Sequence, residues 1–274
     1  MLTYSDPVSL SAAQTVELLA FAGATVRAAG KATLPFFRAD VAVKNKRTDG
    51  SFDPVTQADH AAETLIREAI ERTYPNHGIL GEEYGQAAGN GLTWVIDPID
   101  GTRAFMSGFL HWGVLLGLFD GQRPVLGVMY QPFTDELFSG DRAASRYEQG
   151  AKVRDMRVSS TTQLSDAVMA TTSPKYFAQF DALAGFRRLE EAAKLSRYGG
   201  DCYIYAMLAM GYVDIALDAG LNPYDIQALI PIIEGAGGVV STADGGDASM
   251  GGLVVAAATP QLHEAALREL QGGT

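Results

Sequence analysis

The spacing of apolar and polar residues predicts that helices and then antiparallel strands form the first part of the chain. Apolar residues recur at helical spacing over 9–29, after Ser9 or Ser11 as a cap, and over 54–75. Short apolar runs, two of them joined by an Asp-Gly hairpin signal, then predict strands at 79–80, 93–96, 112–119, 125–130 and 136–139. We therefore expect residues 1–150 to form an α+β lobe with an antiparallel sheet.

The second part of the chain alternates between the two kinds of element. Strands are expected at 167–171, 212–217, 239–240 and 253–257. Helices are expected at 181–193, 201–210, 223–234 and 260–270. Alternation of helices and strands is typical of an α/β lobe. We therefore expect residues 151–274 to form a second, α/β lobe that completes a functional site shared with residues 1–150.

The composition of the 274-residue chain excludes several classes of protein. Hydrophobic residues make up 47% and charged residues 19%, as in a soluble globular protein. No run approaches the roughly 20 apolar residues of a membrane span, and the first residues lack the features of a signal peptide. The net charge of −11 argues against nucleic acid and anionic membranes as partners. Cys202 is the only cysteine, which excludes a disulfide framework, and we expect a cytoplasmic protein.

One segment carries the candidate chemistry. The apolar run at 93–96 leads into Asp97, Pro98 and Asp100, and Gly101 then permits a sharp turn or the close approach of a ligand. Two carboxylates at the end of a buried strand repel each other unless a cation lies between them. Oxygen ligands favour Mg²⁺ or Ca²⁺ over zinc. Taken alone, however, this pattern is more typical of a polar turn, because Asp, Pro and Gly are the usual turn formers.

Further acids stand at the ends of other predicted elements, although spacing alone does not show that they converge. Four segments in order resemble the magnesium-dependent inositol monophosphatase family: DPVTQAD at 53–59, GEE at 81–83, WVIDPIDGT at 94–102, and YD at 224–225 followed by GAGG at 235–238. The resemblance covers nearly the whole chain. It implies the layered αβαβα sandwich of that family, a fold that mixes α+β and α/β features.

The resemblance also implies a role for individual residues. It assigns two or three Mg²⁺ ions to one carbonyl and four carboxylates, those of Ile99, Glu82, Asp97, Asp100 and Asp225. Asp59 would pair with Thr102 to orient and deprotonate the attacking water, and the Gly101 and Thr102 amides would bind the phosphate. A homodimer that acts on a small phosphate monoester is implied as well. Lys46 is a candidate for contact with the phosphate or with water on a third metal ion, and as a basic residue in a polar segment it could instead lie in a solvated loop.

Two of these acids have structural alternatives. Asp59 follows Thr56 by three residues, as in a capping box, so it could be an acid that complements the dipole at the start of a helix. Asp225 follows Pro223 and could have the same helix-terminal role.

Other segments resemble the histidinol-phosphatase branch of the family more than its inositol-specific members. These are Arg103 and the runs 198–202 and 220–225. Asp201 falls where inositol phosphatases usually have a small residue, and Asp218 where they have a glutamate. Two carboxylates suit a cationic leaving group better than a neutral polyol. We therefore expect four substrate-binding residues: Arg103, Gly200, Asp201 and Asp218.

Asp201 and Asp218 also have structural alternatives. Asp201 could be the N-cap of the helix over 202–210, and Asp218 could be an acid in the turn at a strand end.

The expected activity is Mg²⁺-dependent hydrolysis of L-histidinol phosphate to L-histidinol and phosphate, a step of histidine biosynthesis. Two alternatives remain. The first is an inositol-1-phosphatase or a broad sugar-phosphate phosphatase. The second is a catalytically silent protein that binds metal or phosphate and regulates a partner. The intact pair of Asp59 and Thr102 argues against the second alternative.

Overall fold

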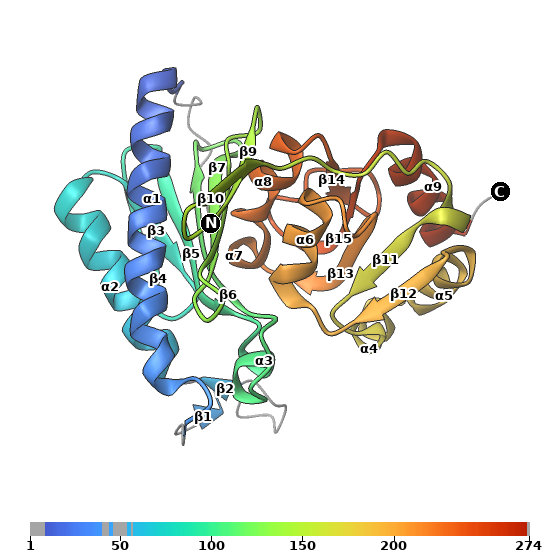
Figure 1. Cartoon of the computed structure of the whole chain (residues 1–274), viewed down its shortest axis with the longest axis horizontal. Helices are drawn as coiled ribbons and strands as arrows, with labels where there is room; N and C mark the ends of the chain where they lie inside the picture. Colours follow the sequence, from blue (N-terminus) through green and yellow to red (C-terminus); the bar gives the residue numbers. More distant parts are fainter. Residues whose placement is uncertain (1–8, 40–43, 46–53, 56, 273–274) are drawn as a thin grey trace.

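The computed structural model describes residues 9–39, 44–45, 54–55 and 57–272, and within them helices and sheets alternate in five layers (Figure 1). The helices are α1 (Ala12–Thr33), α2 (Gln57–Thr73), α3 (Thr102–Met106), α4 (Pro174–Gln179), α5 (Leu183–Ala192), α6 (Asp201–Ala209), α7 (Pro223–Ile226), α8 (Leu229–Gly235) and α9 (Pro260–Gln271). Two short 3₁₀ helices lie at Leu34–Phe36 and Leu164–Asp166. None of the described helices is long and apolar enough to cross a lipid bilayer.

In the described part of the chain, eight strands form the first sheet. Their spatial order is β10 (Lys152–Asp155), β9 (Ser145–Gln149), β8 (Glu136–Gly140), β7 (Pro124–Gln131), β6 (Gly113–Phe119), β5 (Thr93–Asp100), β3 (Gly78–Gly81) and β4 (Gly85–Ala87). Neighbours are antiparallel except for β3 and β5. Helices α1 and α2 cover one face and α8 packs on the other, which explains why β6 is buried along its whole length.

Described residues also form a five-stranded sheet and a separate two-stranded one. The five strands lie in the order β12 (Leu195–Tyr198), β11 (Val168–Thr171), β13 (Ile215–Leu221), β15 (Gly252–Ala257) and β14 (Val239–Thr242). Strand β11 runs parallel to β12 and β13. Helices α6, α7 and α8 lie between the two large sheets, while α4, α5 and α9 cover the outer face of the second (Figure 1). The short pair is β1 (Lys44–Asn45) and β2 (Pro54–Val55).

Among the described residues, three of the four apolar clusters join these layers. One joins α1 and α2 to the first sheet, and its largest side chains include Trp94 and Tyr130. A second fills the space between the sheets around Tyr205 and Phe138. A third lies under α4, α5 and α9. The expected layered αβαβα sandwich is confirmed, with a layer of helices between the two large sheets.

The element predictions are mostly correct, and the exceptions have physical reasons. Ser11 is the N-cap of α1, as one of the two alternatives predicted. The helix expected over 223–234 is two helices, because Pro231 has no N–H to donate to the carbonyl of Gln227. The strand expected over 212–217 begins at Ile215 and continues to Leu221. The pattern did not predict strands β4, β9, β10 and β12, which are partly or wholly exposed and lack a long apolar run.

Candidate active site

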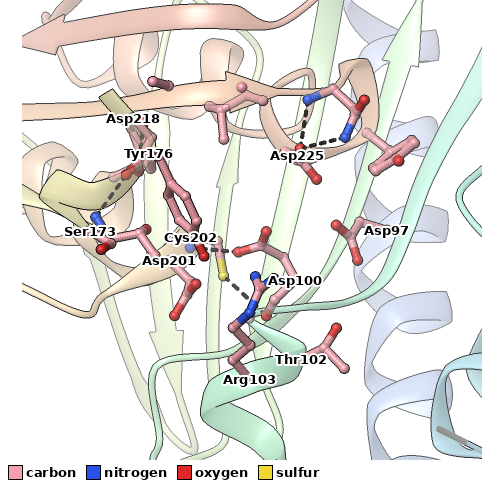
Figure 2. A pocket seen from close by; sticks show the side chains of 18 of the residues that line it. Asp97, Asp100, Thr102, Arg103, Ser173, Tyr176, Asp201, Cys202, Asp218 and Asp225 are labelled. Atoms are coloured by element: carbon pink, nitrogen blue, oxygen red, sulfur yellow. Dashed lines mark hydrogen bonds between the residues drawn. The ribbon is translucent and has the colours of Figure 1, made fainter. Parts of the chain in front are cut away.

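Two acids of the central motif face the same side because β5 contains a bulge. Asp97 lies opposite Leu115 of β6, and Asp100 lies opposite Gly113. Three steps along β5 therefore correspond to two along β6. In a regular strand, residues three apart point to opposite faces. The extra residue on β5 removes this difference and brings both carboxylates into one pocket (Figure 2).

This pocket is a cavity of about 920 Å³ between the two sheets. Ten of the residues expected at the site line it: Glu82, Asp97, Ile99, Asp100, Gly101, Thr102, Arg103, Asp201, Asp218 and Asp225. Asp59 and Gly200 are not among the described residues that line it. A Cβ on Gly200 would lie 2.0 Å from Cγ2 of Ile204, so packing within α6 is enough to explain that glycine.

Three carboxylates form a tight cluster. Oxygen atoms of Asp97, Asp100 and Asp225 all lie within 4.8 Å of one another. A backbone N–H holds each of them: Ile99 N–H donates to Asp97 Oδ1 (3.1 Å), Cys202 N–H to Asp100 Oδ2 (2.6 Å) and Asn222 N–H to Asp225 Oδ2 (2.6 Å). Backbone amides of three different segments thus orient the three acids toward a common point (Figure 2).

The charged forms of these acids are unfavourable in the absence of a cation. Burial raises the pKa of Asp97 well above its usual range, and the charges of Glu82, Asp100 and Asp225 raise it further. Burial also raises the pKa of Asp100 well above its usual range and the pKa of Asp225 to about 6. A divalent cation would offset both burial and repulsion. Because the donors are all oxygens, the cluster fits Mg²⁺.

Asp225 combines a helix-terminal role with its place in the cluster. It is the third residue of α7, and one of its oxygens accepts the N–H of Asn222, the N-cap residue. The helix-terminal alternative for Asp225 is therefore correct as a local description. It does not exclude a metal-binding role, because the same carboxylate also lies against Asp97 and Asp100.

Gly101 turns the chain from β5 into α3. Its φ is 86°, a left-handed conformation, and a Cβ there would lie 2.5 Å from the carbonyl oxygen of His111. Only glycine fits this position without strain. The turn places Thr102 in the pocket wall, where its hydroxyl donates to the carbonyl of Ile99 at 3.1 Å.

Asp59 lies on α2 and is 2% exposed. Its charge contributes to the raised pKa of Asp97, which indicates that the two carboxylates are close. The pairing of Asp59 with Thr102 stays a prediction. Thr56, the expected capping partner of Asp59, and Lys46 lie outside the described residues.

Asp218 belongs to a second acidic group in the pocket. It lies inside β13 opposite Val254, so its interpretation as an acid at a strand end is wrong. Its carboxylate accepts hydrogen bonds from the Thr171 hydroxyl (2.9 Å), the Thr172 N–H (2.7 Å) and the Tyr205 hydroxyl (3.2 Å). Burial raises the pKa of Asp218 to about 6, although these hydrogen bonds lower it. Three hydrogen bonds therefore stabilise the charged form of a carboxyl group that burial destabilises.

Asp201 is the second member of this group. The alternative interpretation of Asp201 as an N-cap is wrong, because Gly200 is the N-cap of α6 and Asp201 is the first helical residue. Its φ is 43°, a left-handed conformation that is uncommon outside glycine. Burial, followed by the charge of Asp218, raises the pKa of Asp201 to about 7, while the Arg103 guanidinium lowers it. Figure 2 shows Arg103 near both Asp201 and Asp100.

Helix α4, which the apolar pattern did not predict, contributes a further wall of the pocket. The guanidinium carbon of Arg103 lies 5.8 Å from the ring centre of Tyr176, a residue of α4 that lines the pocket beside Asp201. A signal for this helix exists in the sequence, because Ser173 caps it and Pro174 occupies its first position. The apolar pattern is too short over these six residues to identify it.

Residues 14–273 match the model of the inositol monophosphatase family. The chain belongs to the inositol monophosphatase family. It is therefore a phosphatase of a metal-dependent family, and the acidic cluster is where such a metal would bind.

Relatives of this inositol monophosphatase family member carry several names. The bifunctional phosphatase IMPL2, chloroplastic, of Arabidopsis thaliana is 34% identical over an alignment that covers 97% of this chain and 78% of that protein. A histidinol-phosphatase of Chlorobaculum parvum is 38% identical over 212 residues, covering 77% of this chain and 80% of that protein. The solved structure of an inositol monophosphatase from Zymomonas mobilis has 34% identity and a TM-score of 0.83, covering 96% of this chain and 100% of that one.

Proposed function

We propose that this phosphatase hydrolyses L-histidinol phosphate to L-histidinol and phosphate with Mg²⁺ bound. The observation that carries the proposal is the second acidic group, Asp201 and Asp218, in the wall of the same pocket as the three-acid cluster. Both carboxylates are kept in a buried site that disfavours their charge. A cationic leaving group would offset that cost, whereas a neutral polyol would not. The similarity to a protein named histidinol-phosphatase supports the same substrate.

The residues of the cluster would hold the metal. Asp97, Asp100 and Asp225 offer oxygens close enough to share cations, and Glu82 lines the same pocket. The carbonyl of Ile99 would complete a set for two or three Mg²⁺ ions. When bound, Mg²⁺ activates water for attack, neutralises the phosphoryl oxygens and stabilises the leaving alkoxide.

The remaining steps belong to residues around the cluster. Asp59 would accept the proton of the attacking water while Thr102 holds that water in line with the phosphorus. The amides of Gly101 and Thr102 would bind the phosphate oxygens. Asp201 and Asp218 would face the amine and imidazole of the leaving group, with Arg103 between Asp201 and the phosphate side of the pocket.

A phosphate-release assay tests the substrate. The purified protein with Mg²⁺ is assayed on L-histidinol phosphate, inositol 1-phosphate and neutral sugar phosphates, and we expect the highest kcat/KM on L-histidinol phosphate. Asp201→Asn should raise the KM for this substrate by roughly 10-fold or more and leave inositol 1-phosphate hydrolysis much less affected. Asp166→Asn, an exposed acid outside the pocket, is the control. A higher kcat/KM on inositol 1-phosphate would refute the assignment.

Two other outcomes correspond to the alternatives. A preference for neutral polyol phosphates would favour an inositol phosphatase, which the likeness to the Zymomonas mobilis enzyme supports. Tight Mg²⁺ binding without phosphate release on any substrate would favour a regulatory protein. The homodimer and the cytoplasmic location are further parts of the proposal, and light scattering of the purified protein tests the first.

A further inference from the structure

The buried carboxylate of Glu63 binds the backbone of the turn that carries Glu82. Glu82 follows β3 and precedes β4, and its own N–H donates to the carbonyl of Ile96 at 3.2 Å. The next two residues, Glu83 and Tyr84, turn the chain back into the sheet. Their amides donate to the carboxylate of Glu63 on α2, whose side chain is 0% exposed.

Both oxygens of Glu63 are used. Oε2 accepts the N–H of Glu83 at 2.7 Å, and Oε1 accepts the N–H of Tyr84 at 3.2 Å and Nε of Arg67 at 2.7 Å. Arg67 in turn donates to the carbonyl of Gly85, the first residue of β4. The pair thus binds three consecutive residues of the backbone that follows Glu82.

The local sequence is adapted to this contact. A Cβ on Gly81 would lie 2.0 Å from Oε1 of Glu63, so a glycine before Glu82 allows the carboxylate to approach the turn. The guanidinium carbon of Arg67 also lies 5.9 Å from the ring centre of Tyr84, so the same side chain contacts the turn a second time. Glu82 is therefore fixed between a strand on one side and a buried ion pair on the other.

We propose that Glu63, supported by Arg67, is a positioning residue that orients Glu82 for metal binding and so sets the affinity of the acidic cluster for Mg²⁺. The proposal rests on the metal-dependent function proposed above. Neither side chain is among the described residues that line the pocket, so the effect would pass through the backbone of the turn. Groups that orient metal ligands typically change metal affinity by about 10–100-fold when they are altered.

Glu63→Gln is a sharp test because it keeps the shape of the side chain. Both carboxylate oxygens accept from N–H groups. Whichever way the new amide is turned, its NH₂ group meets another N–H and one hydrogen bond to the turn is lost. We expect the Kd for Mg²⁺, measured by titration calorimetry without substrate, to rise about 10-fold. At saturating Mg²⁺ the kcat should return to within about 2-fold of the wild-type value.

Asp214→Asn is the matched control. Asp214 is 6% exposed and its two oxygens also accept from different donors, the Val168 N–H at 2.7 Å and the Ser159 hydroxyl. It lies just before β13, outside the described pocket lining. This variant should lower the melting temperature comparably and leave the Kd for Mg²⁺ unchanged. Should Glu63→Gln fail to fold, Arg67→Lys retains the charge and loses the double contact, and we expect its Kd to rise several-fold.

The outcomes separate this inference from the function it rests on. An unchanged Kd in folded Glu63→Gln, or in Arg67→Lys if the first does not fold, would overturn the positioning role while the phosphatase assignment stands. A kcat that stays low at saturating Mg²⁺ with an unchanged Kd would overturn it as well. Absence of Mg²⁺ binding and of phosphate release in the wild-type protein would instead overturn the proposed function.

Discussion

Replacing Asp201 with asparagine should stabilise the metal-free protein at pH 8, although it should impair binding of a cationic substrate. The substitution keeps the size of the side chain. Asparagine also tolerates the left-handed conformation of this residue, whose φ is 43°. What changes is the charge that the folded protein must bury beside Asp218.

The magnitude follows from the pKa. Burial and then repulsion by Asp218 raise the pKa of Asp201 from 3.8 to about 7. This difference corresponds, at about 1.36 kcal/mol for each pKa unit, to about 4 kcal/mol by which the ionised carboxylate destabilises the folded state. An asparagine amide brings an additional N–H donor that must be desolvated, so we expect about 2 kcal/mol of this to be recovered.

The gain should depend on pH in a defined direction. Near pH 4, Asp201 is protonated in the folded chain and partly protonated in the unfolded chain, so the wild-type protein bears little of this cost. The desolvated amide still destabilises the variant, which should therefore be less stable than the wild-type protein by roughly 1–2 kcal/mol. Between about pH 4 and 7 the unfolded chain releases the proton while the folded chain keeps it, and wild-type stability falls as the pH rises. Above about pH 7 the carboxyl is ionised in both states and the difference is complete.

Urea unfolding in EDTA at pH 4 and pH 8 measures this difference. We expect the free energy of unfolding of Asp201→Asn to lie roughly 1–2 kcal/mol below that of the wild type at pH 4 and about 2 kcal/mol above it at pH 8. Equal stabilities at pH 8, or a gain of the same size at both pH values, would refute the inference that Asp201 is a buried charge held at a cost.

Three further outcomes are expected. Gly101→Ala should destabilise the fold by about 2–4 kcal/mol and abolish phosphate release, because φ is 86° and a Cβ would meet the His111 carbonyl; thermal melting and the release assay check this. Tyr205→Phe should lower the free energy of unfolding, measured with urea at pH 8, by about 1–2 kcal/mol. The reason is that the Tyr205 hydroxyl donates to Asp218 and helps to lower the pKa of that carboxyl. Mg²⁺ at about 100 times its Kd at pH 8 should raise the free energy of unfolding by about 2.7 kcal/mol at that pH. The same Mg²⁺ concentration should stabilise the protein less at pH 5, because raised pKa values keep the cluster acids protonated there.

Most of the elements could be predicted because their pattern is local. The apolar period of α1 and its Ser11 cap, the continuous apolar run of β6 and the Pro260 start of α9 are readable without any contact between distant residues. The partly or wholly exposed strands β4, β9, β10 and β12 could not be predicted in this way. β12, for example, is exposed along most of its length, and only its pairing with β11 makes it a strand.

The sequence by itself determined the family and which residue types are available for the proposed chemistry, the acids and the glycine after Asp100. Only the tertiary structure decided how those acids meet. The bulge that turns Asp97 and Asp100 to one side depends on pairing with β6, and the orientation of Asp100 depends on the Cys202 amide, 102 residues along the chain. The physical reason is that residue type and local spacing set what a side chain can do. Its direction and its pKa are set by neighbours that the folded chain brings from far away in sequence.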